Sequence, residues 1–399
     1  MTPKPPFPFD LSLEREIEEF HRIQPRLLEV WDALTMRDEE PHTSVVVPSL
    51  TLDQSELKKL AGASFYEERL LFLLIRLRNP RARVVYVTSQ PIHPMILDYY
   101  FHLLAGIPAS HARSRLTLLC AHDASPRSLT EKILERPRLL QRIREGIQDP
   151  ARAYLTVFNS TPLERQLAVL LGIPMNGADP ELADLGTKSG SRKIFREAGV
   201  ALPAGFEDLA DEQAVVDALR ELQRERPKIK RAVVKLNDSF SGEGNAIFRY
   251  PTSSDRASIE AALEDLEFSV PEETVPAFFA KYRRMAGIVE EFIEGREKVS
   301  PSCQLRISPH QDVLTISTHD QILGGPSQQV FLGCSFPARG DYRLRIQEAA
   351  MKIGAVLAAK GVVSRFAVDF LLWRDEPSAE WEMAALEINL RMGGTTHPY

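Results

Sequence analysis

The chain has 399 residues, 44% of them hydrophobic, which is enough for a large buried core and for two or three domains. Its formal net charge is −6 and the sequence holds no basic block, which argues against a general nucleic-acid-binding protein. Three widely spaced cysteines without a CxxC pair argue against disulfide staples and a structural zinc site, and they fit a reducing cytoplasm. The first residues lack the apolar segment of a signal peptide and no apolar run is long enough to span a bilayer, so we expect a cytoplasmic protein without membrane association.

The first 180 residues alternate short apolar strands with helical segments. A Glu-rich amphipathic helix is predicted at 13–34, strands at 43–48, 84–88, 116–120 and 154–158, and helices at 66–77, 94–104, 129–147 and 162–171. Short, fully apolar strands in such an alternation predict a parallel sheet covered on both faces, hence an α/β domain over 1–180. No G-x-G-x-x-G follows the first strand, so the dinucleotide-binding fingerprint is absent.

From about Leu182 the pattern changes to an α+β arrangement. We expect a second domain over 181–399, with a small lobe at about 205–292 and a large lobe at about 293–399. Helices are predicted at 188–198, 211–225, 255–266, 274–285 and 342–360, between strands.

Two segments near the end of the sequence bring acidic side chains together. In 386–391 apolar residues alternate with Glu387, Asn389 and Arg391, so a strand places these three side chains on one face. A short polar stretch separates this segment from an apolar run that contains Asp369, so we expect two antiparallel neighbours with Asp369 and Glu387 flanking one ion. Carboxylate and amide oxygens suit Mg²⁺, and an arginine suits an anion beside it. The pattern predicts a metal–phosphate site.

The run 232–248 reads as a strand, a small glycine-containing loop and a second strand. Backbone N–H groups of such a loop can contact phosphates while Lys235 reaches from the strand, although a plain hairpin turn has the same pattern. It is no Walker loop, because GK[ST] is missing and the loop joins two strands. The candidate nucleotide-binding residues of this run are Lys235, Ser239, Ser241, Gly242 and Gly244.

Two flanking segments support a nucleotide pocket. Lys188 begins a basic helix that carries Arg192 on the same face. At 288–297 an apolar strand runs into a Glu–Gly–Glu turn, a candidate hinge whose backbone and Glu290 can pair with an adenine edge, and whose Glu297 can hold ribose hydroxyls. Taken singly, a solvated helix residue and a polar turn explain these segments as well. The candidate residues are Lys188, Glu290, Glu291, Phe292 and Glu297.

In this order the motifs resemble the ATP-grasp superfamily. The resemblance rests on Lys188 with Arg192, Lys235 with its Ser/Gly loop, the hinge at 290–297, Asp369, and Glu387-Ile388-Asn389, and it covers roughly 182–399. Members commonly carry an α/β unit in front, a pre-ATP-grasp domain, which matches the first 180 residues. The segments 317–325, 361–370 and 389–398 are most similar to the pheganomycin-type peptide ligases.

The resemblance implies an ATP-dependent carboxylate–amine ligase. ATP would contact Lys188 and Lys235, and Asp369, Glu387 and Asn389 would hold Mg²⁺ (or Mn²⁺). A substrate carboxylate would attack the γ-phosphate to give an acyl phosphate, and an amine would then displace phosphate. Both substrates would be small molecules or peptides, and a homo-oligomer is compatible with the sequence.

Two arginines are candidates for holding the acid or its acyl phosphate. Arg391 lies beside the strand that carries Glu387 and Asn389, called here the metal strand. An arginine fork suits either anion. Arg365 lies four positions before Asp369, whereas D-alanine ligases carry an active-site arginine two positions before the aspartate; Ala367 occupies that place here.

Other features of the sequence leave alternatives. His319 and His397 are tempting bases, but a structural histidine is the simpler interpretation of His319, and His397-Pro398 resembles the segment after the metal strand in biotin carboxylases. A bicarbonate-activating, carboxylase-like enzyme is therefore the enzymatic alternative. The sequence stops soon after the strand that carries Glu387 and Asn389, so we expect either a chain shortened at its C-terminus or a protein without a C-terminal lid. A non-catalytic ATP-binding module is a third interpretation.

Overall fold

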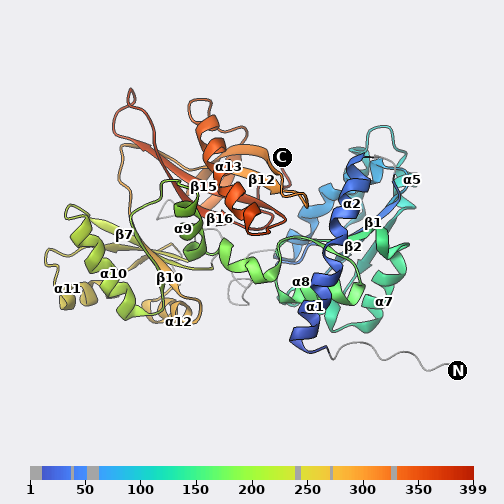
Figure 1. The fold of residues 1–399 in the computed structure, drawn as a ribbon, viewed down its shortest axis with the longest axis horizontal. Coiled ribbons are helices and arrows are strands. Elements are labelled where there is room, and N and C mark those ends of the chain that lie inside the picture. Colours follow the sequence, from blue (N-terminus) through green and yellow to red (C-terminus); the bar gives the residue numbers. More distant parts are fainter. Residues whose placement is uncertain (1–10, 37–39, 52–62, 239–243, 270–272, 325–329) are drawn as a thin grey trace. The chain divides into compact units, whose positions relative to one another are not determined.

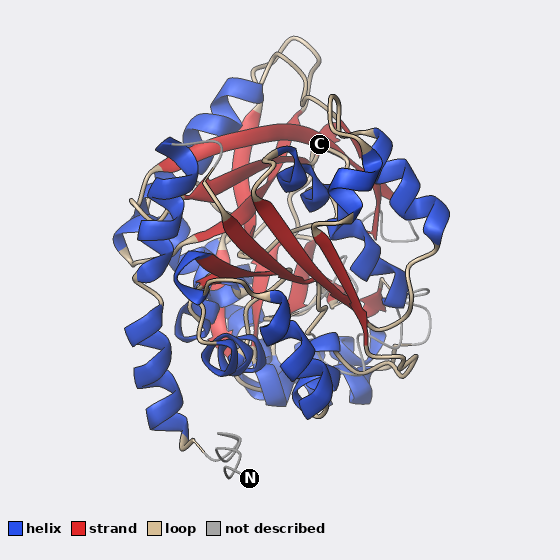
Figure 2. Cartoon of the chain, turned by 90° about the vertical axis from the view of Figure 1, so that its right-hand side faces the viewer, coloured by secondary structure: helices blue, strands red, loops and turns tan. Residues whose placement is uncertain are grey.

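The computed structural model describes residues 11–36, 40–51, 63–238, 244–269, 273–324 and 330–399 (Figure 1). These residues form two compact units: the first ends at Glu181, and the second comprises Leu182–His397 and Tyr399. Strands in both units are accompanied by helices (Figure 2). Among the described residues, none of the helices combines the length and apolar character that crossing a bilayer requires.

The first unit is built on a parallel sheet of five strands in the order β3-β2-β1-β4-β5. The strands are β1 (His42–Val47), β2 (Ala82–Thr88), β3 (Leu116–Cys120), β4 (Ala153–Val157) and β5 (Met175–Asn176). The central strands are buried along nearly their whole length, as expected for a sheet covered on both faces. The predicted α/β class is confirmed.

Prolines divide two helices that the sequence pattern predicts as continuous. The segment 13–34 forms α1 (Leu13–Ile23) and α2 (Arg26–Met36), separated at Pro25, and the segment 129–147 forms α6 (Leu129–Leu134) and α7 (Pro137–Gly146). Proline lacks an N–H for the helical ladder and its ring clashes with the preceding turn, so the helix is interrupted at each proline. The remaining helices of this unit are the 3₁₀ helix η1 (Ala63–Arg78), α4 (Pro94–His102), α5 (Ala109–Arg113), η2 (Pro150–Arg152), α8 (Pro162–Leu171) and η3 (Pro180–Gly186), the last of which runs into the second unit.

The second unit begins with α9 (Lys188–Glu197) and holds two sheets. The first, called here the small sheet, has the order β6-β10-β7-β8-β9 and is antiparallel. Its strands are β6 (Gly205–Leu209), β7 (Arg231–Leu236), β8 (Asn245–Arg249), β9 (Glu267–Phe268) and β10 (Gly287–Glu291), with α10 (Glu212–Glu225), α11 (Arg256–Ala262), η4 (Leu263–Asp265) and α12 (Val275–Met285). Apolar side chains from these strands and helices form one core.

The second sheet of this unit, called here the large sheet, has the order β11-β15-β12-β13-β14, and β16 pairs with β15. Its strands are β11 (Glu297–Val299), β12 (Pro301–Ile307), β13 (Val313–Gly324), β14 (Val330–Ser335), β15 (Ser364–Arg374) and β16 (Glu382–Asn389), and its helix is α13 (Arg343–Ala359). Burial alternates along β15, with Phe366, Val368 and Phe370 fully or almost fully buried and the residues between them partly exposed. Alternate side chains point to opposite faces of a sheet, so one face is buried and mostly apolar, and the other, called here the polar face, carries Arg365 and Asp369 among its partly exposed residues.

His319 on β13 is buried, 2% exposed, and its ring lies 5.1 Å from that of Phe336. Among the described residues its Nδ1 has no hydrogen-bond partner. Burial lowers the pKa of His319 from 6.5 to about 4. The burial fits a structural histidine, but the hydrogen bond expected at its Nδ1 is missing among the described residues, and its role stays a prediction.

The buried imidazole makes the stability of the second unit depend on pH. Between pH 6.5 and pH 4 the unfolded chain binds a proton at His319 that the folded chain does not, so stability is lost as the pH falls. We expect the free energy of unfolding to fall by up to about 3 kcal/mol more in the wild type than in His319→Gln over this range. Urea titrations at several pH values measure this, with the exposed His310→Gln as the control. Equal pH slopes for the wild type and His319→Gln would contradict the prediction.

Candidate active site

The polar face of the large sheet aligns the predicted metal ligands in two rows. The first row runs from His319 through Ser302 and Asp369 to Glu387, which are paired residue by residue across β13, β12, β15 and β16. The second row, two residues further along, holds Ser317, Gln304, Ala367 and Asn389. Paired residues in neighbouring strands share a face, so the strand register itself brings Asp369, Glu387 and Asn389 together. The predicted antiparallel pairing is what the structure shows.

Asp369 and Glu387 are directly opposite each other. Burial and the charge of Glu387 raise the pKa of Asp369 to about 6, while hydrogen bonds from Ser302 and Gln321 act in the opposite direction. Two adjacent carboxylates repel each other, and a divalent cation relieves that repulsion. The hard-oxygen donor set therefore fits Mg²⁺.

The amide of Asn389 lies between Asp369 and Arg391. Its Nδ2 donates to Asp369 Oδ2 (3.0 Å), and its Oδ1 accepts from the Arg391 guanidinium (3.0 Å). The predicted ligand oxygen thus faces Arg391, and the amide has to turn before that oxygen can join the two carboxylates. Asn389 as a metal ligand stays a prediction.

Lys188 meets the carboxylate pair from α9. Thr187 caps this helix by accepting from the Gly190 N–H (3.0 Å), so Lys188 is its first residue. The Lys188 side chain is 4% exposed and its Nζ lies 3.4 Å from Glu387 Oε1. A buried lysine beside an acidic pair places positive charge where phosphate oxygens can approach.

Two further polar contacts fasten α9 to its surroundings. Ser191, fully buried, accepts from the backbone N–H of Ile388 (3.0 Å), the residue between Glu387 and Asn389. At the end of β7, Asn237 Oδ1 accepts from both the N–H (3.0 Å) and the hydroxyl (2.7 Å) of Ser189. The helix thereby ties the metal strand to the strand that carries Lys235.

Lys235 belongs to a buried charge network with Glu290 and Arg192. Its ammonium pairs with Glu290 Oε1, and the other Glu290 oxygen lies 3.4 Å from an Arg192 nitrogen. Arg192 also donates to the carbonyls of Pro203 (3.0 Å) and Gly205 (2.8 Å). Arg192 is one helical turn beyond Lys188 in α9. The helix therefore connects Lys188 to Lys235 through Arg192 and Glu290.

The predicted hinge residues have protein partners in this structure. Glu290 is 2% exposed and engaged with Lys235, Glu291 accepts from the Ala204 N–H (2.9 Å), and the Phe292 ring lies under the Arg231 guanidinium, 3.8 Å from its centroid. Glu297 accepts from Arg374 (2.7 Å). Their roles toward adenine and ribose remain predictions.

The other predicted residues lie as follows. Ser239, Ser241 and Gly242 fall outside the described residues, and the Gly244 carbonyl accepts from the Leu236 N–H (3.0 Å). Arg365, on the polar face, lies directly opposite Arg306 on β12. Arg391 follows β16 instead of belonging to it, because its N–H turns back to the Asn389 carbonyl (2.8 Å).

Several residues of this site were not predicted from the sequence. Ser191, Asn237, Gln304 and Asp238 act through contacts that span large distances in the chain. Loss of hydration raises the pKa of Asp238, the Lys188 ammonium counters this and Glu387 adds to it, so Asp238 belongs to the same charged group. Its place two residues after the end of β7, the strand that carries Lys235, was the one available signal.

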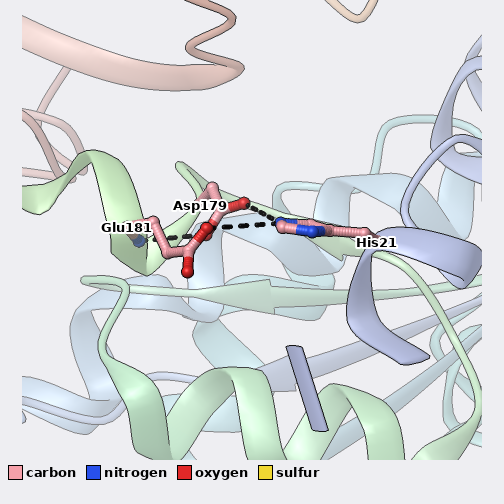
Figure 3. A group of neighbouring side chains, drawn as sticks. All are labelled: His21, Asp179 and Glu181. Atoms are coloured by element: carbon pink, nitrogen blue, oxygen red, sulfur yellow. Dashed lines mark hydrogen bonds and ion pairs between the residues drawn. The ribbon is translucent and has the colours of Figure 1, made fainter. Parts of the chain in front are cut away.

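A second group of metal-type side chains lies in the first unit (Figure 3). His21 Nε2 is 2.8 Å from Asp179 Oδ2 and 3.7 Å from Glu181 Oε2, and all three side chains contact solvent. The imidazole and the carboxylates already bind one another, so a hydrated surface ion pair accounts for the group.

Comparison with known proteins finds a matching family model and two similar proteins. A family model described as "IQCH-like, ATP-grasp" matches residues 180–260 and 272–395, just over half of the chain. L-propargylglycine–L-glutamate ligase of Streptantibioticus cattleyicolor is 29% identical over 362 residues, covering 89% of this chain and 72% of that protein. IQ motif-containing protein H of Danio rerio is 25% identical over 427 residues, covering 94% of this chain but only 40% of that protein.

Solved structures give the same fold. The biotin carboxylase–β-γ-ATP complex from Campylobacter jejuni superimposes with a TM-score of 0.56 at 14% identity, covering 90% of this chain and 68% of that one. At this identity the likeness concerns the fold. The family model, which matches more than half of the chain, identifies it as a member of the IQCH-like ATP-grasp family.

Proposed function

We propose that this protein is an ATP-dependent carboxylate–amine ligase that forms an amide through an acyl phosphate and releases ADP and phosphate. The observation that supports it most is the contact of Lys188 with Glu387, whose neighbour across the strands is Asp369, in a chain of the ATP-grasp family. The similar ligase from Streptantibioticus is named for joining two amino acids, which supports amide formation.

The residues of the second unit divide the work between them. Lys188 and Lys235 would neutralise phosphate oxygens of ATP, and Asp369, Glu387 and a turned Asn389 amide would hold Mg²⁺, which would draw charge from the phosphates when bound. Arg391, held by Asn389, is the candidate for the substrate carboxylate, with Arg365 as the second candidate.

The proposed reaction has two steps and uses only the acid, the amine and ATP. An oxygen of the acid attacks the γ-phosphorus, the bond to the β–γ bridging oxygen breaks, and ADP leaves. The amine nitrogen then attacks the acyl carbon, the bond from that carbon to the phosphate oxygen breaks, and the leaving phosphate takes up the proton that the nitrogen loses. Phosphoryl transfer needs mainly positioning and charge neutralisation, which this arrangement of buried cations and carboxylates can supply.

A screen of acids against amines tests the proposal. We expect phosphate release with Mg²⁺ and ATP only when both an acid and an amine are present, with L-amino acids as the first panel and bicarbonate included as an acid. Mass spectrometry should find an amide and ADP in equal amounts. Phosphate release with bicarbonate alone would favour a carboxylase-like activity, AMP formation would indicate another mechanism, and tight ATP binding without turnover across the panel would favour a non-catalytic module.

A further inference from the structure

Gln304 lies on the polar face of the large sheet, in the same row as Asn389. It is opposite Ala367 on β15, which is opposite Asn389 on β16. Only 5% of Gln304 is exposed. A buried amide needs hydrogen-bond partners inside the protein, because leaving its donors unsatisfied costs about 1–3 kcal/mol.

The partners of Gln304 come mainly from the segment that follows the metal strand. Its Nε2 donates to the Ser317 hydroxyl (2.9 Å) and to the Thr395 carbonyl (3.1 Å), and its Oε1 accepts from the Thr396 hydroxyl (3.3 Å). A carbonyl oxygen can only accept, so the contact with Thr395 fixes which way the amide points. Both threonines are buried.

Thr396 closes a compact turn with Gly393. The Gly393 N–H donates to the Thr396 hydroxyl (2.9 Å), and the Thr396 N–H donates to the Gly393 carbonyl (3.1 Å). At the other end of the segment, the backbone and guanidinium of Arg391 both bond to Asn389. The segment from Asn389 to Thr396 is thus attached to the sheet at both ends, with Arg391 near one end.

We infer that Gln304 is a positioning residue, which holds the turn Gly393–Thr396 on the sheet and so limits how far the Arg391 guanidinium can move from the carboxylate pair. The inference rests on the proposed function, in which Arg391 holds the acid substrate. Gln304 itself touches neither nucleotide nor metal ligand in this scheme. Its loss should therefore affect the acid and the rate, and leave nucleotide affinity in place.

Gln304→Met tests this, because methionine has a similar length and no amide. We expect amide hydrogen exchange over 391–396 to become at least ~10-fold faster, and KM for the acid to rise ~10-fold or more with a lower kcat. The Kd of MgATP should stay within about twofold, because no nucleotide contact is lost. Gln347→Met on α13 is the matched control and should change none of these quantities. Thr396→Val should reproduce the effect, and Thr396→Ser, which keeps the hydroxyl, should restore wild-type behaviour.

Two readouts keep the inference separate from the proposed function. Unchanged exchange over 391–396 in Gln304→Met would overturn the attachment of the turn. Faster exchange with unchanged KM and kcat would overturn the positioning role. If the wild type released no phosphate with any acid and amine, the proposed function and the role toward the acid would fail together, whereas exchange would still report whether Gln304 holds the turn.

Discussion

Replacing Glu387 by Gln will remove most of the turnover, by roughly 10²- to 10³-fold in kcat, while MgATP still binds. Glu387 lies opposite Asp369 on the neighbouring strand and contacts Lys188 of α9. It therefore lies between the proposed metal site and the lysine proposed to bind phosphate. The neutral amide keeps the shape and removes the repulsion with Asp369, but it also weakens the ion pair with the buried Lys188, so thermal unfolding has to accompany the kinetics to show that the variant is folded. Turnover should be measured against Mg²⁺ concentration. We expect the variant to reach half of its maximal rate at a higher Mg²⁺ concentration than the wild type does.

Glu382→Gln is the matched control for this substitution. Glu382 lies at the exposed start of the same strand, and the change has the same chemistry without touching the carboxylate pair. It should leave kcat and the Mg²⁺ dependence unchanged. Wild-type Mg²⁺-dependent turnover in Glu387→Gln would refute the metal assignment.

The second large effect is expected on nucleotide affinity. Lys235→Met should weaken ATP binding by roughly 10- to 100-fold, the worth of one charge-assisted hydrogen bond of about 1.5–3 kcal/mol. Lys235 is almost buried and is held in place by Glu290, so its ammonium is oriented before the nucleotide arrives. In the variant Glu290 keeps Arg192 as a partner, which protects the fold from an unpaired buried carboxylate.

Isothermal titration with ATP measures this effect without any assumption about the acid or the amine. Lys230→Met, an exposed lysine just before the same strand, is the control and should bind ATP as the wild type does. An unchanged Kd in Lys235→Met would show that the strand does not contribute its lysine to the phosphates.

Local patterns predicted the parts of this site that depend on strand periodicity. Alternation along 386–391 placed Glu387 and Asn389 on one face, and the polar stretch between two apolar runs predicted that Asp369 lies across from Glu387. Proline also carries local information, and Pro25 and Pro137 mark helix ends that hydrophobic periodicity alone passes over. The α/β class and the family resemblance followed from the same kind of signal.

Tertiary contacts were beyond such patterns. The sequence around Ser191 does not show that its hydroxyl accepts from the Ile388 N–H, and the sequence around Gln304 does not show that it contacts Thr395. The residues of each pair are more than ninety positions apart and come together only when the chain folds. The sequence predicts that Glu290 contacts adenine, but its position in a strand gives no information about which cations lie beside it. In the structure these cations are Lys235 and Arg192.

Helix α9 is bonded to both sheets of the second unit. It is bonded to the small sheet through Arg192, with Glu290 and the Gly205 carbonyl, and to the metal strand of the large sheet through Ser191. Separating the two sheets would break the buried contacts of Ser191 and Arg192, which are adjacent in α9, so we expect this helix to hold the sheets together. Under the proposed function, α9 would therefore couple the nucleotide site, through Arg192, Glu290 and Lys235, to the metal site, through Lys188 and Glu387.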